Sequence, residues 1–164
     1  YWLGMLSNIQ VHAKPFAGFW MKKAYMVPKD EPNGNESPDS LATNMEPISV
    51  MNVRSIFVSP EPNQIIKVGE QTDVQGVAFD GGYGITKVEL SADSGKTWLP
   101  AQLDPDLGKY SWRRWHYNFT ASQKGNYNLH VKATNAKGQT QPLQQWNRSG
   151  YMRNEIEILP LKAE

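Results

Sequence analysis

The chain contains no cysteine among its 164 residues. It therefore has no disulfide, no thiolate nucleophile, no thiolate ligand for a metal and no iron–sulfur cluster. The core has to be closed by apolar side chains alone. Hydrophobic residues make up 39% of the chain and include 6 Trp, 7 Tyr and 5 Phe, which is enough for one domain with a proper core.

Long apolar runs and runs of like charge are also missing. No apolar stretch approaches the roughly 18 residues that a membrane-spanning helix needs, so no membrane span is expected. The net charge is only +1, and no run of five or more like charges occurs, which argues against nucleic acid as a partner. Tyr1 opens an aromatic stretch without the pattern of a signal peptide, so we expect the chain to be cut from a longer protein.

The compact motifs of common active sites are absent too. The chain has no G-x-S-x-G elbow, no H-E-x-x-H pair and no phosphate-binding glycine loop that leads into a helix. The three histidines, His12, His116 and His130, are far apart and lack the spacing of metal ligands. No metal-binding or cofactor-binding residue is therefore predicted.

Short strand patterns separated by turn residues are what the chain does have, from residue 50 onward. The cleanest alternation is residues 126–133, where every second residue is apolar. In the hairpin of residues 77–98, Thr86, Val88 and Leu90 alternate with charged residues. Further strands are predicted at residues 50–58, 65–68, 72–79, 98–103, 110–119 and 155–161.

Two details of these strands are specific enough to check. Gly76 inside a strand predicts a bulge or a close approach of another part of the chain. In the last strand, Ile156 and Ile158 are expected to point inward. The whole pattern predicts an all-β fold, an immunoglobulin-like (E-set) antiparallel β-sandwich of about seven strands, with no convincing helix.

The chain before residue 50 differs in composition. Residues 16–27 are rich in aromatics, which we expect either to pack against a missing N-terminal part or to line a site. The following segment is rich in Pro, Asn, Asp and Ser, the composition of a linker. The predicted units are residues 1–30, a linker at 31–49 and the sandwich at 50–164.

Two basic stretches are candidate binding sites. Arg113 and Arg114, between Trp112 and Trp115, could bind an anion or an acidic partner, or could simply pack on the aromatic rings. The loop from Trp146 to Tyr151 combines aromatics, a glycine turn and an arginine, and loops of this kind often contact ligands.

Several separated motifs, in order, resemble one known family. They are GFWMKKAYMVP, MNVRS, GVAFDGGYGITKVELSADSGKTW, YSWRRW and GQTQPLQQWNRSGYMRN. Together they resemble the C-terminal dimerisation domain of the sulfite oxidase family of molybdenum enzymes, with most similarity to bacterial sulfite dehydrogenases. The resemblance implies that the sandwich pairs two subunits and that residues 1–30 are a remnant of the molybdopterin-binding domain.

The resemblance also implies a function for the longer parent protein. Such an enzyme oxidises sulfite to sulfate at a molybdopterin cofactor whose metal is held by a cysteine, and passes electrons to a c-type cytochrome. The implied location is the bacterial periplasm. Because this chain lacks the cysteine, the fragment alone is not expected to be catalytic.

Two residues correspond to family site residues. Tyr25 matches the catalytic tyrosine, which would hydrogen-bond the bound oxyanion, and Arg148 matches a substrate-binding arginine. The family arginine stands directly before the glycine, where this chain has Ser149, so Arg148 is offset by one. The family's lysine and tryptophan near the start of the matching region are replaced by Gly4 and Met5.

A different reading of the same fold stays open. Immunoglobulin-like sandwiches carry many functions, and this one could be a non-catalytic binding or adhesion module that recognises carbohydrate or protein. A row of exposed aromatics on one sheet face would favour that alternative.

Overall fold

Residues 7–29 and 34–164 are described by the computed structural model, and almost all of their regular structure is β. The predicted replacements at Gly4 and Met5 lie outside these residues, as does the predicted boundary at residue 30. Within the described ranges, no helix combines the length and the hydrophobicity of a membrane span.

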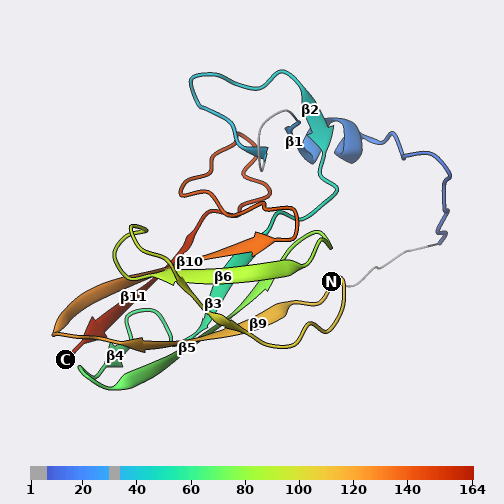
Figure 1. Cartoon of the computed structure of the whole chain (residues 1–164). Coiled ribbons are helices and arrows are strands. Elements are labelled where there is room, and N and C mark those ends of the chain that lie inside the picture. The colour runs from blue at the N-terminus through green and yellow to red at the C-terminus, as the bar shows by residue number, and fades with distance from the viewer. Residues whose placement is uncertain (1–6, 30–33) are drawn as a thin grey trace.

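Two sheets facing each other form the body of the molecule (Figure 1). The five-stranded sheet has the order β4 (Ile65–Ile66), β11 (Glu157–Ala163), β10 (Gly125–Asn135), β6 (Ile85–Ser91) and β7 (Leu99–Pro100). The four-stranded sheet has the order β3 (Arg54–Ser59), β5 (Gln71–Phe79), β9 (Arg113–Thr120) and β8 (Gln102–Leu103). The predicted all-β, immunoglobulin-like sandwich is confirmed. Of its shortest strands, β4 lies in the predicted strand 65–68, and β7 and β8 divide the predicted strand 98–103.

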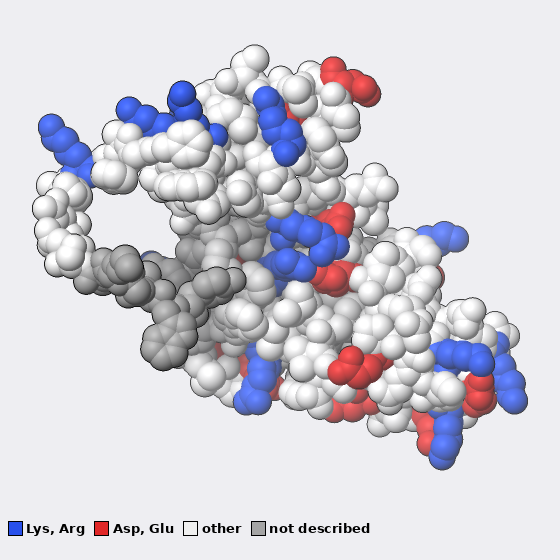
Figure 2. Space-filling model, turned by 180° about the vertical axis from the view of Figure 1, so that it is seen from behind, with Lys and Arg blue, Asp and Glu red and all other residues white. Residues whose placement is uncertain are grey.

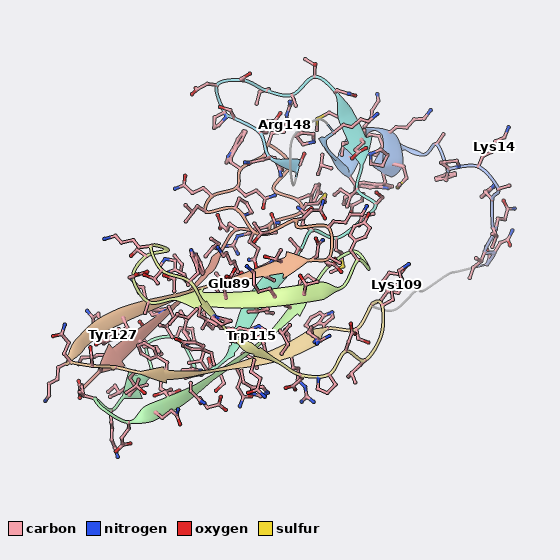
Figure 3. All side chains as sticks on the ribbon, in the orientation of Figure 1. Lys14, Glu89, Lys109, Trp115, Tyr127 and Arg148 are labelled. Atoms are coloured by element: carbon pink, nitrogen blue, oxygen red, sulfur yellow. The ribbon has the colours of Figure 1, made fainter. Side chains whose placement is uncertain are left out.

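The core lies between the sheets and follows the period-two pattern. Leu129, Val131 and Ala133 of β10 are at most 1% exposed, as the alternation of residues 126–133 predicts. Trp115 of β9 is fully buried between the sheets (Figure 3). Tyr127, also labelled there, packs edge-on against Phe119 across the sandwich with ring centroids 5.3 Å apart.

Gly76 shows both features that a glycine in a strand predicts. The pairing of β3 with β5 shifts register between Phe57 and Ser59, opposite Gly76. A Cβ on Gly76 would lie 2.1 Å from Cζ2 of Trp115 and 2.2 Å from the carbonyl oxygen of Ile56. The glycine is needed because the indole of Trp115 fills the space that a side chain would take.

Two side chains do not face inward as the alternation of the sequence predicts: Thr86, on the same side of its strand as Val88, and Ile158 of the last strand. Thr86 is exposed and Ile85 is buried instead, because the register of β6 against β10 shifts between Thr134 and Asn135. In the last strand, Ile158 is 54% exposed.

The error at Ile158 arises because the strand begins later than predicted. Strand β11 starts at Glu157, and its inward residues are Leu159, Leu161 and Ala163. Ile156 is buried as predicted, but it lies ahead of the strand, where its N–H donates to the carbonyl of Pro142. The alternation therefore does not run through it.

The ends of the first predicted strand and the absence of helix also need correction. Strand β3 begins at Arg54 rather than at residue 50, and Met51 is 53% exposed. The five-residue π-helix η1 (Trp20–Ala24) interrupts the aromatic N-terminal stretch. After it, β1 (Met26–Pro28) pairs antiparallel with β2 (Met45–Pro47), which lies in the segment predicted as a linker.

A buried glutamine, Gln141, connects the two sheets by hydrogen bonds. The Oε1 atom of Gln141 accepts from the N–H of Ser55 on β3 at 2.7 Å and from that of Ala133 on β10 at 2.9 Å. Its Nε2 donates to the carbonyl of Glu155 at 3.0 Å. Gln141 therefore fixes the start of the loop that carries the candidate site.

Candidate functional site

The small sheet β1–β2 and the loop of residues 145–152 lie against each other, and their contact is here called the junction. Ser149 Oγ donates to the carbonyl of Met26 at 3.0 Å. The backbone N–H of Trp146 donates to Oδ1 of Asn35 at 2.8 Å. The two sequence-predicted site residues, Tyr25 and Arg148, are thereby brought to the same end of the sandwich.

Arg148 is held by a carboxylate from the segment between β1 and β2. Its Nε lies 3.0 and 3.1 Å from the two carboxylate oxygens of Glu36, its Nη2 also donates to Glu36, and its backbone N–H donates to Oε2 at 3.1 Å. Nη2 donates as well to the carbonyl of Ala42 at 2.5 Å. Within the described residues, Nη1 makes no hydrogen bond, and 40% of the side chain is exposed.

The Glu36 carboxylate is ionised at neutral pH because of these contacts. Its side chain is wholly buried. The hydrogen bond from the Arg148 guanidinium, helped by the backbone N–H groups of Arg148 and Ala42, lowers the pKa of Glu36 to about 2 against the opposing effect of burial. The same carboxylate raises the pKa of Arg148, so the pair stays charged and mutually neutralised.

Tyr25 ends helix η1 and lies in a short chain of aromatic rings. Its ring centroid is 5.6 Å from that of Trp20 and 5.5 Å from that of Tyr151. Its backbone is fixed, since its N–H donates to the carbonyl of Trp20 and its own carbonyl accepts from Ile48. The side chain is 43% exposed, so the phenol can reach a molecule bound at this surface.

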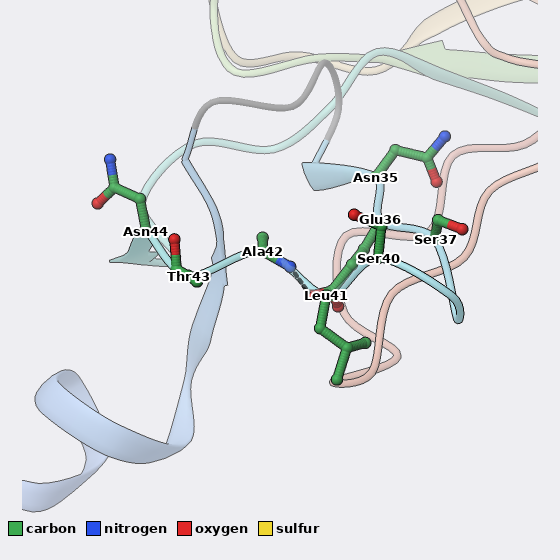
Figure 4. A pocket seen from close by; sticks show the side chains of 8 residues that line it. All are labelled: Asn35, Glu36, Ser37, Ser40, Leu41, Ala42, Thr43 and Asn44. Carbon is green, nitrogen blue, oxygen red and sulfur yellow. Dashed lines mark hydrogen bonds between the residues drawn. The ribbon is translucent and has the colours of Figure 1, made fainter.

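A polar hollow of about 500 Å³ lies on the Glu36 side of the junction (Figure 4). Its lining comes from one segment, residues 35–37 and 40–44. The single charged group among them, Glu36, is taken by Arg148 and by the N–H of Ala42, drawn as the dashed line in Figure 4. The hollow therefore offers neutral polar groups but no free charge.

A second hollow, of about 350 Å³ and mainly apolar, lies beside Tyr151. It is lined by residues 48–52 and 151–153 together with Arg54 and Phe79. Its two arginines are paired: Arg54 with Glu157, and Arg153 with Glu155 at 2.5 Å. Neither arginine therefore presents an unpaired positive charge to this hollow.

The other basic candidate is also neutralised. Arg113 lies 3.2 Å from Asp106, and Arg114 lies 3.4 Å from Asp104. Trp112 stacks on Phe79 with ring centroids 5.0 Å apart. Arg113 and Arg114 therefore belong to surface ion pairs, and Figure 2 shows positive and negative side chains interspersed over the face it presents.

Two residues of the junction could not be found from the sequence. Glu36 stands in a segment whose composition reads as a linker, and it meets Arg148 across 112 positions of sequence. Tyr151 was visible only as one aromatic in the 146–151 loop, without its contact to Tyr25. The packing of the 145–152 loop against β1 and the segment after it brings these groups together.

Comparison with known proteins identifies relatives of the chain. Residues 45–157 match the sequence profile of the Mo-co oxidoreductase dimerisation domain. Sulfite oxidase of Arabidopsis thaliana is 34% identical over 63% of this chain and 26% of its own length. Mitochondrial sulfite oxidase of Mus musculus is 26% identical over 97% of this chain and 30% of its own length.

One solved structure is similar over most of the chain. It is the sulfane dehydrogenase SoxCD from Paracoccus pantotrophus, with a TM-score of 0.65 and 20% identity over 88% of this chain and 36% of that chain. This likeness supports the fold. The chain spans about a quarter to a third of the length of these two sulfite oxidases.

Proposed function

The chain belongs to the family of Mo-co oxidoreductase dimerisation domains, and from this we propose that it is the subunit-pairing part of a molybdopterin-dependent sulfite oxidase or dehydrogenase. The observation that carries the proposal is the family match over residues 45–157, joined to homology with sulfite oxidases that reaches into the N-terminal stretch. The resemblance to bacterial sulfite dehydrogenases supports a periplasmic location and a c-type cytochrome as electron acceptor.

The chain's own residues do not fit the molybdenum site itself. The sequence has no cysteine, and residues 7–29 and 34–164 contain no group of three His, Asp or Glu that could hold a metal ion. The metal ligand of the proposed enzyme would therefore come from another part of the protein. When bound there, the cofactor would supply the two-electron oxidation of the substrate.

What this chain would contribute is recognition of an oxyanion at the junction. Arg148 keeps Nη1 as a donor beyond its pairing with Glu36, and Tyr25 presents a half-exposed phenol. Charged and hydroxyl donors suit the oxygens of sulfite and sulfate. Because Glu36 neutralises Arg148, the arginine would act mainly through an oriented hydrogen bond and only weakly through net charge.

The second contribution would be a two-fold contact, which we assign to the outer face of the four-stranded sheet. Its apolar strip consists of Ile56, Val77 and Phe79, with Ile56 paired to Val77 across β3 and β5, and of Trp112, which stacks on Phe79 from the turn before β9. All four are partly or largely exposed. An exposed apolar strip on a sheet suits the self-complementary contact of a symmetric dimer.

The non-catalytic alternative finds no specific support. The large aromatics that are most exposed lie in the N-terminal stretch, in turns or in loops: Phe16, Phe19, Trp20, Tyr25, Tyr83, Tyr110, Trp112 and Trp146. Among the described residues, no row of such aromatics runs along a strand of either sheet. A carbohydrate-binding face of that kind is therefore not proposed.

The test uses the full-length protein that carries this chain. We expect it to contain molybdenum and to reduce cytochrome c when sulfite is added. Arg148→Lys, which loses the planar guanidinium but keeps a charge for Glu36, should raise KM for sulfite roughly tenfold, the size of one charge-assisted hydrogen bond. A full-length protein without molybdenum would overturn the functional proposal and leave the fold untouched.

A further inference from the structure

Among the residues that the structure describes, Tyr25 has two ring neighbours, and Tyr151 is the one that lies between strands β10 and β11 of the sandwich in the sequence. The centroids of Tyr25 and Tyr151 are 5.5 Å apart with the planes inclined by 50°. The other neighbour, Trp20, lies in the short helix η1 and is itself 60% exposed. Tyr151 is only partly exposed and belongs to a loop that hydrogen bonds attach to the larger body.

The loop that carries Tyr151 is fixed internally by one buried side chain. Asn147 is 7% exposed, and its Nδ2 donates to the carbonyl of Tyr151 at 2.9 Å. Its Oδ1 accepts from the N–H of Ser149 at 3.1 Å, and its carbonyl accepts from Gly150 at 3.1 Å. The position of Tyr151 is thus set by Asn147.

The same loop is tied to the segment that follows β1. Asn147 Nδ2 also donates to the carbonyl of Gly34 at 3.1 Å, and Arg148 donates hydrogen bonds to the buried carboxylate of Glu36. Ser149 closes the connection through its hydrogen bond to Met26, the residue after Tyr25. Hydrogen bonds therefore run without a break from the start of β1, through the loop, to the backbone carbonyl of Tyr151, the residue whose ring lies on Tyr25.

We propose that Tyr151 is a positioning residue for Tyr25. The 147–151 loop, held by the ion pair of Arg148 with Glu36, places the Tyr151 ring against that of Tyr25. The inference rests on the proposed role of Tyr25 at the substrate. A half-exposed phenol that must meet an oxyanion loses rotational freedom when a neighbouring ring packs on it, and small misplacements of a reacting group are costly. The contact, and not the hydroxyl of Tyr151, does the positioning.

The experiment is a double-mutant cycle in the full-length molybdenum-loaded enzyme. Tyr151→Leu, which removes the ring, should lower kcat for sulfite roughly three- to tenfold, the worth of one aromatic pair, with a smaller change in KM. Tyr151→Phe keeps the ring and should retain full kcat. In a Tyr25→Phe background, which already lacks the phenol, Tyr151→Leu should cause no further loss.

Tyr110→Leu is the matched control, because Tyr110 is 73% exposed and lies outside the junction. If Tyr151→Leu does not fold, Tyr151→Met, which keeps the apolar volume, takes its place. An equal loss from Tyr151→Leu with and without the Tyr25 hydroxyl overturns the inference, as does no loss at all. If Tyr25→Phe alone leaves kcat unchanged, the proposed role of Tyr25 fails and the inference fails with it.

Discussion

At the scale of single residues, the pairing of Glu36 with Arg148 makes the junction sensitive to acid. The folded pKa of Glu36 is about 2, below its ordinary 4.5, so the ionised carboxylate favours the folded junction. This contribution is complete above pH 4.5 and is lost as the pH falls through about 2. We expect the backbone N–H of Arg148, which donates to Glu36, to lose protection from hydrogen exchange over that range.

Two variants separate this effect from general acid unfolding. Glu36→Gln should expose the N–H of Arg148 at neutral pH and remove the acid step. Asp93→Asn is the matched control: hydrogen bonds from Ser91 and Thr97 lower the pKa of Asp93, but it lies in the turn after β6, away from the junction. If the junction of Glu36→Gln stays protected and titrates like the wild type, Glu36 does not hold the loop.

Gly76 gives a second prediction at this scale. In Gly76→Ala the new methyl would overlap the indole of Trp115 and the carbonyl of Ile56, both of which are fixed in the core. We expect a loss of roughly 1–3 kcal/mol in the free energy of unfolding, measured with urea. Thr120→Ala, at an exposed position of β9, is the control and should change stability by less than about 0.5 kcal/mol.

At the scale of elements, the hydrogen bonds of Gln141 connect the two sheets beside the junction. Gln141→Leu keeps most of the volume but leaves the N–H groups of Ser55 and Ala133 without an acceptor, in residues that are fully buried. Two such groups predict a loss of roughly 2–5 kcal/mol in unfolding free energy.

The same substitution at an exposed glutamine provides the comparison. Gln123 lies in the turn before β10, and its side chain makes no hydrogen bond among the described residues. Gln123→Leu should be close to neutral in the urea titration. Equal unfolding free energies of the two variants would show that the hydrogen bonds of Gln141 do not stabilise the fold.

At the scale of the whole molecule, the assigned dimer face can be tested with one substitution on each sheet. Val77→Asp places a carboxylate in the apolar strip of the four-stranded sheet, opposite Arg114 on β9, which is already paired with Asp104. Because a buried charge without full pairing is costly, we expect the dimer to become a monomer in sedimentation at micromolar concentration.

Ile158→Asp is the control, because Ile158 is 54% exposed on the outer face of the other sheet. That variant should remain a dimer. If Ile158→Asp dissociates the protein and Val77→Asp does not, the contact lies on the five-stranded sheet instead. A wild-type monomer would contradict the proposed pairing altogether.

The sequence by itself determined the class of fold and most of the core. Alternation along β9 and β10 depends on local geometry, since successive side chains of a strand point to opposite faces, and Trp115, Leu129 and Val131 are buried accordingly. The order of the motifs along the chain was also sufficient to identify the family, because recognising motifs does not require knowing which residues are in contact.

What only the tertiary structure decided are the places where distant segments meet. A register shift opposite Thr134 turned Thr86 outward, and the later start of β11 turned Ile158 outward. A local pattern of residues does not show where the neighbouring strand imposes such a change. The junction depends in the same way on contacts between residues more than a hundred positions apart, such as Glu36 with Arg148. An ion pair of this kind leaves no periodic pattern in the sequence, because its two charges become partners only once β1, β2 and the 145–152 loop have packed together.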